Sequence, residues 1–142
     1  MDDLEALIDK LRKVEALKEG ATTDGEKQAA RQAHRALVER LEQLRETEPA
    51  VEYKFTFQDP WANRLFLAVC RYYELRPYRY KGQHRTTVML RVPESFVDDT
   101  LWPMFEEYND ILQDHRREMT ERVIEQVFDD DASGPDIVES LE

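Results

Sequence analysis

The sequence predicts an α+β fold in which helices cover a small mixed sheet. Three observations predict it: apolar residues recur at helical spacing near both ends of the chain, segments near the middle alternate with a period of two, and one almost entirely apolar helix lies between those segments. At 142 residues the chain suits one compact domain with attached helices. We expect a helical hairpin at 1–48, an α+β core with a long C-terminal helix at 49–128, and a disordered acidic tail at 129–142.

Residues 1–48 are predicted to form an antiparallel helical hairpin. The first helix has the 3-4-3 spacing of a coiled-coil seam, at Leu4, Leu7, Leu11 and Val14. Gly20 can end this helix, and Thr23 with Glu26 can cap a second helix that runs to about residue 47. The second helix has its own apolar stripe, which includes Leu37, Leu41 and Leu44. Neither stripe can be covered fully by the other, so the hairpin needs a further packing partner.

Residues 51–75 are predicted to form a strand followed by the central core helix. The segment VEYKFTF at 51–57 alternates between apolar and polar side chains, as a half-buried strand does. Asp59 and Pro60 then provide a helix start, because Asp is a good N-cap and Pro is tolerated at the first helical position. The helix that follows is apolar on nearly all sides and should be buried.

Two further strands are expected before Pro93. PYRYK at 77–81 is predicted as the second strand and RTTVMLRV at 85–92 as the third, with the turn at Gly82. A right-handed crossover would make the first and second strands parallel. The third strand is the richest in β-branched and apolar residues, so we expect it in the centre. The predicted sheet is therefore three-stranded and mixed, with strand order 1-3-2.

A long helix is predicted from about residue 100 to residue 128, with Pro103 tolerated in its first turn. Such a helix is longer than the sheet it covers, so its distal end should project. Identical chains most often cover exposed apolar stripes by pairing about a two-fold axis, which predicts a homodimer. The alternative is a three-helix bundle within one chain. The residues expected at the dimer interface are Leu7, Leu11, Val14, Leu37, Leu41, Leu44, Met119, Val123 and Val127.

Positive charge is concentrated in the middle of an acidic chain. The net charge is −11, yet residues 64–91 hold seven arginines or lysines against one glutamate, and residues 92–142 hold three arginines against sixteen acids. If Val88 and Leu90 face the core, alternation places the bases on the opposite face of the sheet. The same reasoning turns Tyr78 and Tyr80 toward the core. The predicted basic face consists of Lys54, Arg79, Lys81, Arg85 and Arg91 around Met89.

Three interpretations of this basic face are open. It could receive an acidic helix or segment, from a partner protein or from the C-terminal region of another copy. It could bind single-stranded nucleic acid or a phosphate ligand, but the net charge repels a polyanion and no aromatic residue is expected on that face. The bases could also protect an edge strand and pair internally with acids. We favour a non-enzymatic protein-interaction or scaffold module, with nucleic-acid or phosphate binding as the alternative.

Catalytic and cofactor motifs are absent from the sequence. There is no G-x-S-x-G, P-loop or G-x-G-x-x-G, and the three histidines lack the spacing of a zinc or di-iron site. The acidic run EEYNDILQDH, which ends at His115, is best explained as a solvated helix face. We therefore expect no catalytic residue, no cofactor and no metal.

The expected compartment follows from the apolar segments. The longest apolar run, LFLAVC, is far shorter than a membrane span, and the acidic start MDDLEAL is unlike a secretory signal. Cys70, the single cysteine, lies in that run and is predicted to be a buried hydrophobic residue. We expect a soluble, cytoplasmic protein that does not bind membranes.

Overall fold

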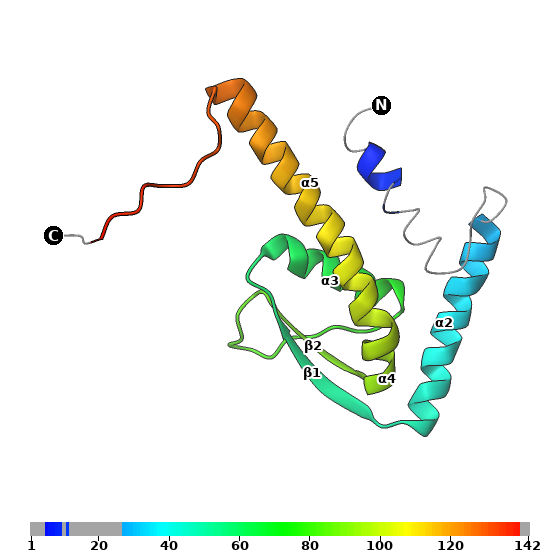
Figure 1. Cartoon of the computed structure of the whole chain (residues 1–142). Coiled ribbons are helices and arrows are strands. Elements are labelled where there is room, and N and C mark those ends of the chain that lie inside the picture. The colour runs from blue at the N-terminus through cyan, green and yellow to red at the C-terminus, as the bar shows by residue number, and fades with distance from the viewer. Residues whose placement is uncertain (1–4, 10, 12–26, 140–142) are drawn as a thin grey trace.

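A computed structural model of the chain describes residues 5–9, 11 and 27–139. Its elements are α2 (Lys27–Thr47), β1 (Ala50–Thr56), α3 (Pro60–Tyr72), β2 (Thr87–Pro93), α4 (Glu94–Phe96), the π-helix η2 (Val97–Leu101) and α5 (Trp102–Phe128). Helix α3 and the first half of α5 pack over one face of the β1–β2 sheet, and α2 lies along one side of this assembly (Figure 1). The class is α+β with a long C-terminal helix.

The prediction of a three-stranded mixed sheet with order 1-3-2 is wrong. The sheet has two strands, and β1 and β2 are antiparallel, with Ala50 opposite Pro93 and Thr56 opposite Thr87. The predicted second strand at 77–81 is reduced to one isolated bridge between Tyr78 and Met89. Two features of the backbone end the pairing there, one on each side of Tyr78.

Pro77 precedes the bridge residue Tyr78 and has no N–H group to donate to β2. After the bridge, the N–H of Tyr80 donates to the side-chain oxygen of Gln83, 2.9 Å away, and is therefore not available for a ladder. Gly82 then turns the chain with a φ of 92°. Residues 77–81 are thus a loop that touches β2 at a single residue.

The start of α3 forms as predicted from Asp59 and Pro60. Asp59 is the N-cap, and its side chain accepts a hydrogen bond of 2.8 Å from the backbone N–H of Trp61. The helix buries Phe66 completely. This ring lies in an aromatic cluster with four partners, whose centroids are 4.5 to 6.1 Å away: Phe55, Phe57, Trp102 and Phe105. The cluster joins β1, α3 and α5 into one core.

The second predicted helix belongs to this core. In α2, Leu41 is only 3% exposed, and Leu37 and Leu44 pack against the same core cluster. Residues 5–9 and 11, which fall in the first predicted helix, are helical. Val14 and the loop of the predicted hairpin lie outside the described residues.

Helix α5 is buried at its start and exposed toward its end. Pro103 is in the first turn, as predicted, and Met104 and Phe105 are buried. From Met119 onward nearly every described side chain of the helix is exposed, and Asp129 ends it in the left-handed conformation. Residues 131–138 continue as exposed chain without regular structure. None of the described helices combines the length and apolar character needed to cross a membrane.

Candidate functional site

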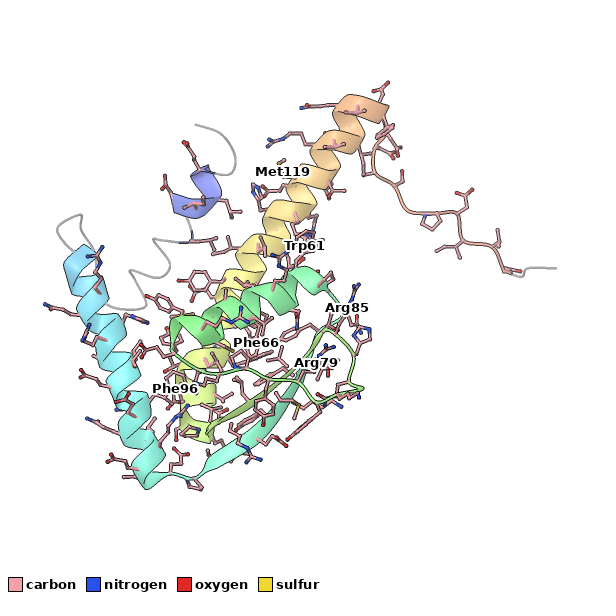
Figure 2. All side chains as sticks on the ribbon, turned by 180° about the vertical axis from the view of Figure 1, so that it is seen from behind. Trp61, Phe66, Arg79, Arg85, Phe96 and Met119 are labelled. Carbon is pink, nitrogen blue, oxygen red and sulfur yellow. The ribbon has the colours of Figure 1, made fainter. Side chains whose placement is uncertain are left out.

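The candidate site is the loop between α3 and β2, here called the basic loop and defined as residues 76–86. Its sequence, RPYRYKGQHRT, contains four cationic side chains and no acid. It emerges from one side of the molecule, where Arg79 and Arg85 project away from the core residues Phe66 and Phe96 (Figure 2). The cationic side chains of the loop are Arg76, Arg79, Lys81 and Arg85, and all of them are exposed.

Backbone hydrogen bonds give the basic loop a defined shape. Tyr78 and Met89 exchange two of them, of 3.0 and 2.7 Å. The tip is a tight turn, in which the N–H of Gln83 donates to the carbonyl of Tyr80 at 3.2 Å. Arg79 donates through Nη1 to the carbonyl of Gln83 at 3.2 Å, which is a second hydrogen bond across the turn. The cations are therefore presented from a fixed backbone.

Two tyrosines attach the loop to β1. The hydroxyl groups of Tyr78 and Tyr80 both donate to Oε2 of Glu52, and Nη2 of Arg91 lies 3.7 Å from the same oxygen. The hydrogen bonds from Tyr78 and Tyr80 hold the pKa of the Glu52 carboxyl below its ordinary value. Conversely, the bond to the carboxylate raises the pKa of Tyr78 to about 12. Glu52 is therefore an ionised anchor for the loop.

The prediction that Tyr78 and Tyr80 point into the core is wrong. Residues directly opposite in an antiparallel pair share a face, and Tyr78 lies opposite Met89 rather than opposite an inward-facing residue. Tyr80 is 48% exposed. The outer face of the sheet is thus covered partly by the basic loop, and Met89 beneath it is only 5% exposed. The predicted open face around Met89 is replaced by a loop with cations along its rim.

Most of the predicted cations lack an internal counter-ion. Arg91 lies beside Glu52, but Lys54, Arg79, Lys81 and Arg85 form no ion pair with any carboxylate among the described residues. Internal pairing with acidic residues therefore does not explain why the bases are concentrated here. Exposed guanidinium and ammonium groups on a fixed loop can bind carboxylates or phosphates through charge-assisted hydrogen bonds.

His84 has a fixed orientation at the base of the loop. Its Nδ1 accepts from the backbone N–H of Thr86 at 3.3 Å, and the Thr86 hydroxyl lies 2.7 Å from the same nitrogen. Because a backbone N–H can only donate, Nδ1 is the acceptor and the proton of the neutral ring is on Nε2. The Nε2–H is a further donor beside the cations.

A hollow lies between residues 5–9 and α5. It has a volume of about 200 Å³ and is lined by Ala6, Leu7, Ile111, Asp114, His115, Glu118, Met119 and Arg122. Asp114 is paired with Arg117 at 3.3 Å. Among the described residues, no group of three or more His, Cys, Asp or Glu side chains is placed to hold a metal ion. This hollow supplies no recognisable chemistry.

The residues predicted for a dimer interface are separated by the structure. Leu37, Leu41 and Leu44 pack within their own chain. Leu7 lines the hollow beside α5, and Leu11 is half-buried. The remaining described residues of the predicted interface form an exposed apolar stripe along distal α5: Met119, Val123 and Val127. Among the predicted interface residues that the structure describes, these three alone are exposed as a group.

Sequence reasoning missed the role of Glu52, Tyr78 and Tyr80 in building the site. The signal was present, since two tyrosines lie within the densest run of bases and β1 carries a single acid, but only the register of the bridge brings them together. Comparisons of the chain with protein-family models, with curated proteins and with solved structures found no match.

Proposed function

We propose that the protein is a non-enzymatic interaction module whose basic loop binds an acidic segment of a partner protein. The observation that carries the proposal is the set of uncompensated cations, Arg79, Lys81 and Arg85, on a loop fixed by hydrogen bonds to Glu52 and Met89. A loop that served only to connect α3 and β2 would need neither the cations nor the anchor.

Preorganisation favours binding to a flexible peptide. An extended acidic segment loses conformational freedom when it binds, so a loop that is already ordered limits the entropy cost to one partner. Guanidinium groups take carboxylates in a bidentate manner, and Lys81 at the turn adds a mobile point charge. Glu52 divides the site, because its carboxylate repels an anion placed directly over the tyrosine hydroxyls. The acids of the ligand would therefore lie along Arg79, Lys81 and Arg85.

Single-stranded nucleic acid is the second candidate ligand. The exposed ring of Tyr80, which is flanked by Arg79 and Lys81, offers a stacking surface for one base. Three features disfavour nucleic acid. Tyr80 is a single stacking ring where single-stranded nucleic-acid binders usually have several, and both the Glu52 carboxylate and the net charge of −11 repel phosphates. We therefore place the acidic peptide first.

Fluorescence anisotropy with three labelled probes separates the two ligands. The probes are a peptide of the sequence DDDASGPDIVESLE, the same peptide with each acid replaced by its amide, and an oligothymidylate of equal length. Of the three probes, we expect only the acidic peptide to bind. The double variant Lys81→Glu/Arg85→Glu should lower its affinity by at least about ten-fold at low salt. Arg40→Glu, an exposed charge reversal on α2, is the matched control and should leave binding unchanged.

Each other result is informative. Tighter binding of the oligothymidylate than of the acidic peptide would make nucleic acid the ligand class. Equal binding to the amide peptide would show that charge is not recognised. No binding of any probe at low salt would remove both candidate functions.

A further inference from the structure

The outer edge of β1 presents its backbone in a pattern that can be worked out from two hydrogen bonds. The N–H of Phe57 donates to the carbonyl of Thr86 at 3.2 Å, so the backbone of Phe57 points toward β2. Backbone direction alternates along a strand, and the odd-numbered residues of β1 therefore face β2. The hydrogen bonds of Met89 support this assignment. Both backbone groups of Met89 bond to Tyr78, so they point away from Lys54, the residue opposite Met89 on β1.

The even-numbered residues of β1 consequently point their N–H and C=O groups outward. The outward groups of Glu52 and Lys54 have no hydrogen-bond partner among the residues that the structure describes. The side chains of these residues are exposed, and Val51 on the inner face is 41% exposed. An open edge of this kind is a template for another strand.

We propose that β1 pairs with β1 of a second copy of the chain, antiparallel and about a two-fold axis at Tyr53. In this register Glu52 lies opposite Lys54 of the second copy and Lys54 lies opposite its Glu52. The seven residues of β1 from Ala50 to Thr56 are then all paired. The strand is thus self-complementary in charge, because its acid and its base lie on the same face at equal distances from Tyr53.

Both the backbone and the charges select this register. Outward-pointing residues are even-numbered, so a shift by one residue would set them against residues that point the other way. A shift by two places Lys54 opposite Lys54, or Glu52 opposite Glu52, and directly opposed like charges are destabilising. Only the register centred on Tyr53 pairs outward groups with outward groups and acid with base.

Apolar side chains on the inner face add to the pairing. Tyr53 meets Tyr53 of the second copy, and Val51 meets its Phe55, both in non-hydrogen-bonded pairs where side chains approach most closely. The exposed Val51 would be covered. The two sheets would become one continuous sheet of four strands, with the two basic loops related by the two-fold axis.

Lys54 has an alternative role, because a lysine in the middle of an edge strand is a common device against pairing. The two roles predict opposite results in solution. Light scattering of the full chain at about 100 µM, where a dimer of micromolar Kd is fully formed, should give twice the chain mass of 16.9 kDa. A mass of one chain at that concentration overturns the proposal.

A charge-reversal pair tests the register. Lys54→Glu and Glu52→Lys each give the strand two like charges, so each variant alone should be a monomer. Mixed in equal amounts they restore both opposite-charge contacts, and the mixture should return to twice the chain mass. Circular dichroism of each variant shows whether the fold is kept. Glu52→Lys also removes the anchor of the basic loop, which is why the recovery in the mixture, and not the loss alone, is the decisive result.

Val123→Glu, on the exposed apolar stripe of α5, is the matched control and should leave the dimer intact. Dissociation by Val123→Glu with no effect of the β1 variants would place the interface on α5 and overturn the proposal. A dimer that persists in Lys54→Glu and Glu52→Lys would overturn it as well.

Discussion

The rings of His34 and Tyr72 lie 3.9 Å apart between centroids, and Nε2 of His34 donates to the backbone carbonyl of Tyr72 at 2.6 Å. This contact joins α2 to the last residue of α3. With the buried Leu41 nearby in sequence, it makes α2 part of the core rather than a separate arm. The division of the chain at residue 48 that the sequence predicts is therefore not a boundary between independent packing units in the described residues.

Leu41→Ala should destabilise the whole domain. Leu41 is 3% exposed and belongs to the core cluster, so removing its side chain leaves a cavity that costs about 2–5 kcal/mol of unfolding free energy. Chemical denaturation followed by tryptophan fluorescence measures the change. Val123→Ala, at a position that is 47% exposed, should change it by no more than about 0.5 kcal/mol. Equal effects of the two substitutions would contradict the placement of α2.

Asp59 should contribute a cap and an ion pair that can be measured separately. Burial raises the pKa of Asp59, but the N–H of Trp61, the amide of Gln113 and the Arg116 guanidinium 2.8 Å away together lower it below its ordinary value. Asp59→Ala removes both interactions and should cost about 1–2 kcal/mol at neutral pH. Asp59→Asn keeps a capping oxygen and should cost less.

The pH dependence follows from the sign of that shift. Because the folded-state pKa of Asp59 is depressed, its charge stabilises the fold above the ordinary value near 4 and is lost as the pH falls through the folded-state pKa. The unfolding free energies of the wild type and Asp59→Asn should therefore converge in acid. A constant difference down to the most acidic pH at which the protein is folded would show that Trp61, Gln113 and Arg116 do not stabilise the charged form of Asp59.

Tyr78 should be a late-titrating phenol. Its hydrogen bond to Glu52 raises the pKa of Tyr78 to about 12. The stabilisation that this hydrogen bond gives the fold is therefore complete below the ordinary tyrosine pKa near 10, and it is lost as the pH rises through about 12. Tyrosinate absorbance resolves the titration, and Tyr78→Phe assigns it. Glu52→Gln should bring the pKa of Tyr78 closer to its ordinary value. An unchanged titration in Glu52→Gln would mean that the loop is not anchored as described.

Cys70 should be inert until the protein unfolds. It is fully buried, and burial raises the pKa of the thiol to about 12, so almost no thiolate forms at neutral pH. Labelling with a thiol reagent should require opening of the core, and its rate should rise in Leu41→Ala by the factor by which that substitution increases the unfolded population. Rapid labelling of the wild type would show that α3 is accessible in the native state.

The sequence was sufficient wherever a local signal has one physical meaning. Asp59 before Pro60 marks a helix start, Pro103 marks a first turn, and Cys70 in an apolar run is buried. Alternation at 51–57 correctly gave a half-buried strand, in which Tyr53 and Phe55 face the core. In each of these cases the deciding interactions lie within a few residues of the signal.

Register and partner choice could not be predicted, because they depend on residues distant in sequence. The tyrosines of the basic loop were assigned to the wrong face because a shift of one residue in pairing with β2 reverses every side chain. Likewise, the apolar stripe that contains Leu41 has the same spacing whether it packs on its own core or on another chain. The candidate site could be located by its charge, but its anchor, Glu52, could not be identified.

The connection between β1 and β2 also constrains how the chain folds. The nearest paired residues of the two strands, Thr56 and Thr87, are separated by the whole of α3 and the basic loop. Closing a chain segment of this length costs roughly 3 kcal/mol in entropy before any ladder bond forms. Phe66 can offset that cost, since it contacts Phe55 and Phe57 close by in sequence and gives the returning strand an apolar surface. We expect α3 with its aromatic contacts to be structured in the folding transition state and β2 to add afterwards, so that truncation of Phe66 slows refolding whereas changes on distal α5 do not.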